Sequence, residues 1–443
     1  MLQILKKINY LLPPWAVLPL KYLPEKIIFG LGYKEECKNL SFKDNIVSIN
    51  LFEILNYARQ HTVYGRENIP RDFSQEEAVD VLKGLPKISS SDLSRNLQYF
   101  ISDEFSSVNS YLTTTGGTGR QPTAVRLSNA TYGIEWAHMF DIWSHGGYKR
   151  RQNLKLTLRG FHFPSGQLYR FNPIYNEIMV DSFQLWNSDF SKFMQEIKRY
   201  NISCIHGYPS LIKIFIDRLK SYSIDFPVSM VFLGSEGVSI EMKKHIAVFF
   251  HAKVLSWYGQ TEKVILAADF DASDNFACYS SYGFADISTP DDNGFGEIIG
   301  TTFINKAMPL INYRTGDYGK ILVKDGIRYL TDIHGRWGKD FIYLNGEVSI
   351  PTSAVNLHTK VQEKILFYQI IQDDYAVLTV HILPKKKFID NVAELTKIEK
   401  EINNDLSERL KGFTLKISCV KNDSDIIRSS RGKQIMLVQN IKR

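Results

Sequence analysis

The sequence predicts an α/β protein with a large N-terminal body of mixed sheets and helices and a small α+β domain at its C-terminus. The chain has 443 residues, more than one hydrophobic core usually organises. The segment "VSMVFLGSEGVSIEMKKHIAVFFHAKVLSWYG" predicts a strand, a turn of small residues, an amphipathic helix and a second strand, which together form a βαβ unit. After Arg336 the remaining residues show their own β-β-α-β order, which is that of a compact separate domain.

The other elements follow from apolar periodicity along the chain. Residues 41–60 and 75–83 carry apolar residues three and four positions apart and are predicted to be helical. Ser91 and Asp92 resemble the cap of another short helix. Further elements are predicted in this order: a helix over 132–143, a strand in "NLKLTLRG", a helix over 191–200, a strand in "ISCIHGY", a helix from Pro209, and short strands and turns from Gly294 onward.

Composition limits the class of protein. The N-terminal stretch is apolar, but its prolines and Lys21 interrupt it well short of the roughly 20 apolar residues of a spanning helix, so we expect a packed or interfacial extension and not an integral membrane protein. Cys37, Cys204, Cys278 and Cys419 lie far apart without a CxxC pair, which predicts reduced thiols in a cytoplasmic protein and no zinc site. The net charge of +7 is spread along the chain and favours anionic small molecules over nucleic acid.

A stretch rich in glycine and threonine, "YLTTTGGTGRQPT", suggests a phosphate site. Glycines allow close backbone approach, and hydroxyl and N–H groups suit anionic oxygens. The spacing G-x-x-x-x-G-K-[ST] and the fingerprint G-x-G-x-x-G are both absent, which excludes the two common nucleotide loops and leaves a surface turn as the alternative. The residues that would clamp the phosphates are Thr114, Thr115, Gly116, Gly117, Thr118, Gly119 and Arg120.

Further short stretches follow in a specific order. They are "GSEG" at 234–237, "WYGQTEK" at 257–263, "YRTGDYG" at 313–319, "GRWGKDFIYLNGEVSIP" at 335–351, and Lys433 after Arg431 and Gly432. This set resembles the adenylate-forming superfamily of acyl-CoA synthetases, within it the phenylacetate-CoA ligase-like branch, whose relatives include proteins of capsular polysaccharide gene clusters. The resemblance covers roughly Tyr111 to the C-terminus.

The resemblance implies a domain organisation and a reaction. An adenylating body would span residues 1–338, and a mobile domain would span 339–443 with its hinge at Lys339. The body would join a carboxylic acid to AMP at the expense of ATP, with Mg²⁺ neutralising charge on the phosphates. Lys433 would bridge the carboxylate and the α-phosphate and would leave when the domain rotates.

The resemblance also implies nucleotide contacts within the body. Thr261 would contact the α-phosphate, and Glu262 would hold Mg²⁺, although singly it is equally well a solvated acid. Asp317 would accept two ribose hydroxyls, or be a simple turn aspartate. Tyr258 would offer its aromatic face to adenine, unless it is ordinary core. The other residues implied for nucleotide binding are Gly234, Ser235, Glu236, Gly259, Gln260 and Arg336.

The chain departs from the family pattern in its first loop. Gly117 replaces a hydroxyl residue, Arg120 replaces the usual lysine, and Gln121 is inserted before Pro122. A nucleotide-binding protein without turnover is therefore one alternative to an enzyme. The leading hypothesis is acyl transfer to coenzyme A, and the other enzymatic one is amide formation with an amino sugar or amino acid of a surface polysaccharide.

The pocket for the acyl group has no short motif. His206, Tyr208 and Trp257 lie at predicted strand ends beside the nucleotide motifs, so they are candidates to line it. The alternative is that all three are simply packed in the core.

Overall fold

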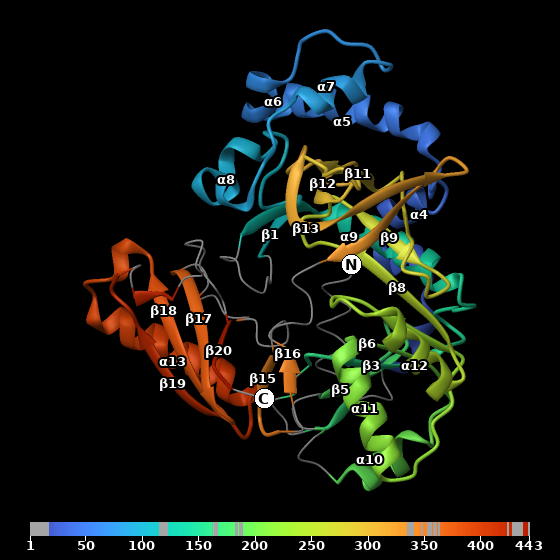
Figure 1. Ribbon diagram of the computed structural model, residues 1–443, viewed down its shortest axis with the longest axis vertical. Helices are drawn as coiled ribbons and strands as arrows, with labels where there is room; N and C mark the ends of the chain where they lie inside the picture. Colours follow the sequence, from blue (N-terminus) through green and yellow to red (C-terminus); the bar gives the residue numbers. More distant parts are fainter. Residues whose placement is uncertain are drawn as a thin grey trace.

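The computed structural model describes residues 17–114, 123–161, 163, 167–181, 185, 189–334, 341–346, 349–351, 357, 361, 364–422, 425–427 and 437–441. Figure 1 shows a large body, coloured from blue to light orange, and a smaller C-terminal unit of strands and one long helix in darker orange and red. The predicted boundary between 338 and 339 lies outside the described residues.

Short helices precede the main sheet. They are η1 (Leu18–Tyr22), α3 (Glu25–Phe29), α4 (Leu31–Glu36), η2 (Asp44–Ile46), α5 (Val47–His61), α6 (Val63–Asn68), α7 (Ala78–Gly84), α8 (Ser90–Arg95) and η3 (Leu97–Phe100). The predicted helices over 41–60 and 75–83 correspond to α5 and α7. The predicted cap at Ser91 is wrong: Ser89 caps α8, with Ser89 and Asp92 forming a reciprocal capping box.

The described part of the N-terminal extension packs on the body. Ile28 and Phe29 of α3 are buried together with Tyr175 against aromatic side chains of α9 (Asn129–Ser144). The helices approach closely because Gly133 of α9 lacks a side chain: a Cβ there would lie 2.4 Å from the carbonyl oxygen of Phe29. Among the described residues, no helix is both long and apolar enough to cross a membrane.

A 12-stranded sheet forms the centre of the body, in the order β11-β12-β13-β14-β10-β9-β8-β7-β6-β3-β5-β4. Neighbouring strands from β8 to β5 run parallel, whereas those from β11 to β8 run antiparallel. The strands are β3 (Leu154–Arg159), β4 (Tyr169–Asn172), β5 (Glu177–Asp181), β6 (Ile202–Gly207), β7 (Met230–Leu233), β8 (Lys253–Gly259), β9 (Leu266–Asp269), β10 (Phe276–Cys278), β11 (Gly283–Ser288), β12 (Gly296–Thr302), β13 (Tyr313–Lys324) and β14 (Ile327–His334).

Helices cover both faces of the parallel strands. The helices α10 (Phe190–Ile197), α11 (Pro209–Ser221) and α12 (Ile240–Phe250) pack on one face and share a buried cluster with β3, β5, β6 and β7. Helix α9 packs on the other face, where Trp143 and Phe232 stack at a ring separation of 5.1 Å. The predicted βαβ unit is confirmed as β7, α12 and β8, with β7 and β8 parallel.

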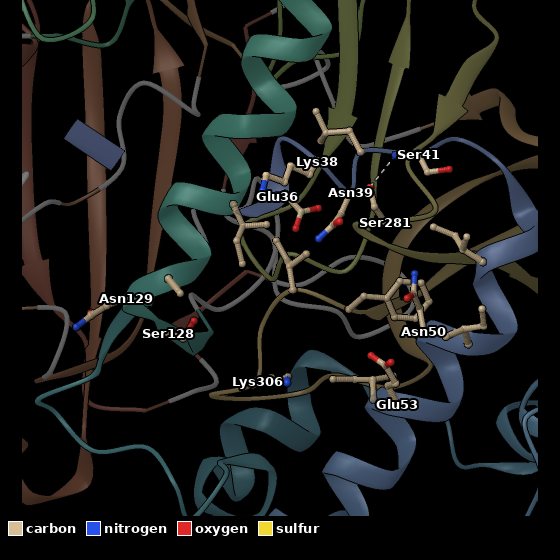
Figure 2. A pocket seen from close by; sticks show the side chains of 18 of the residues that line it. Glu36, Lys38, Asn39, Ser41, Asn50, Glu53, Ser128, Asn129, Ser281 and Lys306 are labelled. Atoms are coloured by element: carbon tan, nitrogen blue, oxygen red, sulfur yellow. Dashed lines mark hydrogen bonds between the residues drawn. The ribbon is translucent and has the colours of Figure 1, made fainter. Parts of the chain in front are cut away.

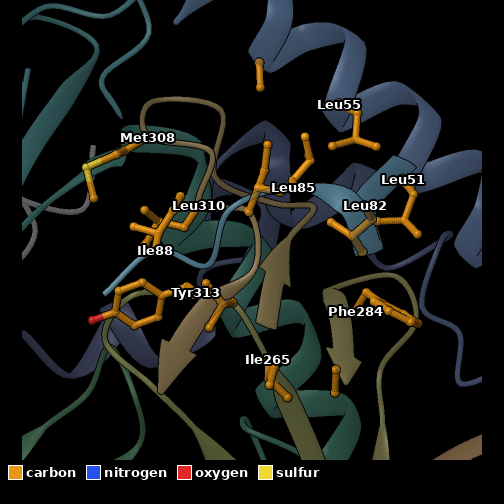
Figure 3. Close-up of a cluster of buried hydrophobic side chains, with 14 of the residues drawn as sticks. Leu51, Leu55, Leu82, Leu85, Ile88, Ile265, Phe284, Met308, Leu310 and Tyr313 are labelled. Atoms are coloured by element: carbon orange, nitrogen blue, oxygen red, sulfur yellow. The ribbon is translucent and has the colours of Figure 1, made fainter. Parts of the chain in front are cut away.

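A second core lies between the antiparallel strands and the early helices. Figure 3 shows Leu51 and Leu55 of α5 above residues of the sheet, with Tyr313 of β13 on the same cluster. Tyr313 is almost fully buried, so the start of the "YRTGDYG" segment is anchored in the core. A separate hairpin, β1 (Ser110–Thr114) and β2 (Ala124–Ser128), flanks the glycine-rich stretch.

The C-terminal unit has its own sheet and core. Its order is β19-β18-β17-β20, and the described part of its core includes Ile370, Val380 and Ile402. Its elements are β17 (Ile365–Asp374), β18 (Val377–Pro384), η7 (Lys386–Phe388), α13 (Val392–Arg409), β19 (Thr414–Cys419) and β20 (Leu437–Gln439), with the small pair β15 (Phe341–Tyr343) and β16 (Ser349–Pro351) before them. The predicted β-β-α-β order is confirmed in β17, β18, α13 and β19.

Candidate functional site

The carboxyl ends of β3, β6, β7 and β8 lie at one edge of the sheet, because these four strands are neighbours and parallel. In open α/β sheets, ligands bind outside this edge. Tyr208, the "GSEG" turn and the "GQTE" turn directly follow β6, β7 and β8. The topology therefore brings these predicted segments to the same edge.

The "GSEG" turn is shaped by its contact with β8. A Cβ at Gly234 would lie 2.3 Å from the indole ring of Trp257, so only glycine fits there. Ser235 has a φ of +69°, a backbone conformation that non-glycine residues rarely adopt and that concentrates at functional sites. Its hydroxyl oxygen accepts a hydrogen bond of 2.9 Å from Nη2 of Arg159, at the end of β3. Glu236 is buried, whereas Ser235 is exposed at the edge.

Two hydrogen bonds join the "WYGQTEK" and "YRTGDYG" segments. The Tyr258 hydroxyl donates to Oδ2 of Asp317 at 3.0 Å, and the Tyr313 hydroxyl donates to Oε1 of Glu262 at 2.8 Å. Each segment thus supplies one tyrosine and one carboxylate. Each hydrogen bond fixes the position of the carboxylate that accepts it.

Tyr258 differs from its prediction. Its side chain is fully buried, so no aromatic face is open to adenine in this structure. Burial, reinforced by the negative charge of Asp317, raises the pKa of Tyr258 well above its usual value and keeps the hydroxyl a donor. The prediction that the ring of Tyr258 is open to adenine is therefore wrong for this structure. The ring belongs to the core, and its hydroxyl positions Asp317.

The turn before Asp317 is built by local hydrogen bonds. The Thr315 hydroxyl donates to the carbonyl oxygen of Ile298 at 2.7 Å and accepts from the Asp317 amide at 3.1 Å. Gly316 has a φ of +77°, which this turn requires and which glycine adopts without strain. Asp317 is largely buried as a result, with its carboxylate fixed at the bend.

The "GQT" part of the other turn is more open. Gly259 is exposed, and Gln260 and Thr261 are half-buried. Oε1 of Gln260 accepts from the Ile265 amide at 3.3 Å, whereas its Nε2 is buried and has no partner. An unpartnered buried amide is a donor that a bound ligand can use.

Two of the residues predicted for the acyl group, His206 and Trp257, lie on the face of the sheet that α9 covers. His206 lies between Trp143 and Trp257, with ring centroids 5.1 and 5.7 Å away. Its Nδ1 is buried without a hydrogen-bond partner. Burial first, and then the positive charges of Arg159 and Lys155, lower its pKa well below the usual value, so the imidazole is neutral. Tyr208 stands apart, with the Arg159 guanidinium 5.1 Å from its ring centroid.

Sequence reasoning missed two residues that organise this edge. Arg159 contacts both the "GSEG" turn and Tyr208, and Tyr313 holds Glu262. The available signals were an arginine that ends an alternating strand and a tyrosine that opens a motif already identified. Neither signal indicates a partner, because the partners lie 76 and 51 positions away along the chain.

The other predicted site residues cannot be placed. Thr115, Gly116, Gly117, Thr118, Gly119, Arg120, Arg336, Lys339 and Lys433 lie outside the described residues. Thr114 is described: it ends β1, is exposed, and pairs with Ala124 at the start of β2.

A magnesium ion fits the donor set at Glu262. Mg²⁺ is commonly bound by one or two carboxylates together with substrate phosphates. Glu262 is half-buried at the edge, and Tyr313 orients its carboxylate. Within the described part of the chain there is no group of three or more potential metal ligands, so a dedicated cage of protein ligands is absent from that part.

Comparison with known proteins identifies the fold. No family model and no curated protein matches the sequence. A structure of 2-hydroxyisobutyryl-CoA ligase in complex with 2-HIB-AMP and CoA, in the thioesterification state, is similar with a TM-score of 0.51 and 16% identity over 89% of this chain and 90% of that chain. The same ligase in the postadenylation state, with R3-HIB-AMP, gives a TM-score of 0.50 and 15% identity over 89% of each chain. The predicted architecture, a large α/β body with a small α+β C-terminal domain, is confirmed as the fold that this ligase has, and at this identity the likeness concerns the fold alone.

Proposed function

We propose that the protein adenylates a carboxylic acid with ATP and then transfers the acyl group to coenzyme A. The observation that carries the proposal is the pair of tyrosine–carboxylate hydrogen bonds that holds Glu262 and Asp317 at the carboxyl edge of the parallel strands. The fold supports it, because a ligase of the same fold has been captured with an acyl-AMP and CoA.

The first half-reaction forms a mixed anhydride. An oxygen of the substrate carboxylate attacks the α-phosphorus of ATP, and the bond to the β-phosphate oxygen breaks to release pyrophosphate. Glu262 would hold Mg²⁺, which supplies positive charge to the phosphates, and Thr261 would donate to the α-phosphate. Asp317 would accept hydrogen bonds from the ribose hydroxyls, assisted by Arg336.

The adenine would lie against the "GSEG" turn. Gly234 keeps this turn close to Trp257, and the backbone of Ser235 and Glu236 is at the sheet edge. Thr114 to Arg120 would clamp the β- and γ-phosphates, since the hairpin strands β1 and β2 lead into and out of that segment.

The second half-reaction transfers the acyl group. The coenzyme A sulfur attacks the acyl carbon, and AMP leaves with the electrons of the anhydride bond. We propose that the unit from 339 to 443 rotates about Lys339 between the two steps, and that Lys433 serves the first step only. The separate sheet and core of this unit support such a motion.

The acid itself would meet a mostly apolar wall. Trp257 is half-buried and would offer ring surface, whereas His206 is buried against it. We therefore expect an acid with an apolar body that packs on Trp257.

The test is isotope exchange between labelled pyrophosphate and ATP, with and without candidate acids. Acid-dependent exchange is expected, and Lys433→Ala should slow it by about 10²- to 10³-fold without changing ATP affinity. Absence of exchange with a broad panel of acids would contradict the proposal and favour the alternative, a nucleotide-binding protein without turnover. AMP release that accelerates with coenzyme A supports the thiol acceptor, and acceleration only with an amine contradicts it.

A further inference from the structure

A pocket lies away from the motifs described above. It has a volume of about 1010 Å³ and is enclosed by the segment from α4 to α5, the start of α9, and loops at Ser281 and at 303–306. Figure 2 shows Glu36, Asn39 and Ser281 toward one side of this pocket and Lys306 and Glu53 toward the other. None of the residues that line it belongs to the "GSEG", "WYGQTEK" or "YRTGDYG" segments.

Apolar side chains form one part of the walls of this pocket, beside polar and charged residues that include Lys38, Asn50, Glu53 and Lys306. Ile46, Ile49, Phe105, Ile134 and Phe303 all line it. Ile49 is 41% exposed although it belongs to the amphipathic helix α5, so part of the apolar wall is open to a ligand. A pocket of this volume, lined by both apolar and polar groups, is in the size range of small-molecule sites.

The polar end of the pocket contains a carboxyl group without a donor. Oε1 of Glu36 is buried and has no hydrogen-bond partner. His138 of α9 lies beside it, with its Nε2 3.4 Å from Oε1. Nδ1 of His138 donates to the carbonyl oxygen of Ile134, so in the neutral ring Nε2 is an acceptor, and the Ser281 hydroxyl satisfies it at 3.0 Å.

The backbone forces Glu36 into this position. Helix α4 ends at Glu36 and packs against α9 at two glycines, Gly133 and Gly32, where a Cβ on Gly32 would lie 3.1 Å from the carbonyl oxygen of Ala130. The close crossing carries the end of α4 to His138. Burial raises the pKa of Glu36 to about 7 and lowers that of His138 to about 4, so both groups are disfavoured in their charged forms.

We propose that this pocket binds a primary amine with an apolar body, whose ammonium group donates to Glu36. The side chain of Glu36 is 13% exposed, and an ammonium group that reaches it supplies the counter-charge that the largely buried carboxylate needs. A neutral alcohol supplies only a donor, and a carboxylate ligand would repel Glu36. The proposal does not depend on the proposed ligase activity. The pocket shares no residue with the motif edge, by which we mean the "GSEG", "WYGQTEK" and "YRTGDYG" segments at the carboxyl ends of the parallel strands.

Calorimetric titration of the full chain with 2-phenylethylamine and with 2-phenylethanol tests the proposal. The two probes have the same shape and differ in the charged group. The amine should bind roughly 10- to 100-fold more tightly, as expected for a charge-assisted hydrogen bond in a buried site. Glu36→Gln should remove this preference, whereas Glu35→Gln, an exposed acid on the same helix that does not line the pocket, should keep it.

Two further measurements locate the amine. Its affinity should increase between about pH 6 and about pH 8 as Glu36 ionises, while the amine stays charged; His138, Cys37 and Lys38 are the other titratable groups near Glu36. Ile49→Trp should weaken both probes by filling the open wall, and it remains informative if Glu36→Gln unfolds the protein.

Three results would overturn the proposal. They are equal affinities for amine and alcohol, an unchanged preference in a folded Glu36→Gln variant, and no saturable amine binding below about 10 mM.

Discussion

The carboxylates of Glu262 and Asp317 at the motif edge have hydrogen-bond donors, whereas Oε1 of Glu36 in the same body has none. Glu262 and Asp317 each receive a hydrogen bond from a buried tyrosine, at 2.8 and 3.0 Å. Glu36 faces a histidine nitrogen at 3.4 Å that has no proton to give. The comparison teaches that burial by itself does not determine what an acid does; the presence or absence of a donor does.

The two regions also differ in how the acids reach their positions. Glu262 and Asp317 each lie in a turn formed by their neighbours in the chain. Each also accepts a hydrogen bond from a tyrosine that is distant in the sequence. Glu36 ends a short helix, and two glycines at a helix crossing decide where it lies. Glu262 and Asp317 are thus held by donors of the protein itself, whereas the proposed ligand would supply the counter-charge of Glu36.

Removal of the paired charge at the motif edge should have the largest effect. In Glu262→Gln the amide keeps one oxygen but loses the charge, and we expect acid-dependent pyrophosphate exchange to fall by about 10²- to 10³-fold. The Mg²⁺ concentration that gives half-maximal exchange should rise. Chelation of the metal in the wild type should abolish exchange, and identical Mg²⁺ dependence of the two proteins would remove Glu262 from the metal site.

The second acid of the pair should affect nucleotide affinity. Asp317→Asn replaces an acceptor of two hydroxyls by an amide, and the KM for ATP should rise by about 10- to 100-fold, since hydrogen bonds to charged groups contribute about 1.5 to 3 kcal/mol. The KM for the acid should change little. Steady-state kinetics with each substrate varied in turn separate the two, and a change confined to the acid would contradict a ribose contact.

Substitution of Glu36 should change the stability of the protein and not its activity. The pKa of Glu36 is raised from 4.5 to about 7, so between these values the folded chain holds a proton that the unfolded chain has released, and stability falls as pH rises. Glu36→Gln does not titrate, so its stability relative to wild type should increase by about 1 to 3 kcal/mol from pH 4.5 to pH 7. Urea unfolding at both ends of this window measures it, and a difference independent of pH would mean that Glu36 is not buried as described.

The smallest expected effect comes from one tyrosine hydroxyl. Tyr313→Phe keeps the buried ring and removes the donor to Glu262, which should cost about 0.5 to 1.5 kcal/mol of unfolding free energy. The Mg²⁺ dependence should shift in the same direction as in Glu262→Gln, but less. Tyr318→Phe, at an exposed position of the same strand, is the matched control. Equal behaviour of the two variants would show that the hydroxyl of Tyr313 does not orient Glu262.

Local sequence patterns predicted the elements and motifs that depend on neighbours in the chain. Apolar periodicity and turn residues predicted the βαβ unit of β7, α12 and β8 and the order of β17, β18, α13 and β19, because side-chain spacing along a helix or strand is a local property. The motifs predicted Glu262 and Asp317 as site residues, because the residues that form their turns are adjacent in the chain. The order of the motifs carried the resemblance from which the fold was expected.

Which of these residues come into contact depends on interactions between distant parts of the chain. The partners of Glu262 and Asp317 are 51 and 59 positions away, and the 12-stranded order that joins them is a long-range property of the sheet. The burial of Tyr258 depends on the same packing, so its ring could not be assigned to core or ligand from the motif. Glu36 and His138 are more than 100 residues apart in the sequence and meet because helices α4 and α9 cross. Glycines allow the helices to approach closely, and their role depends on the packing of the two helices against each other.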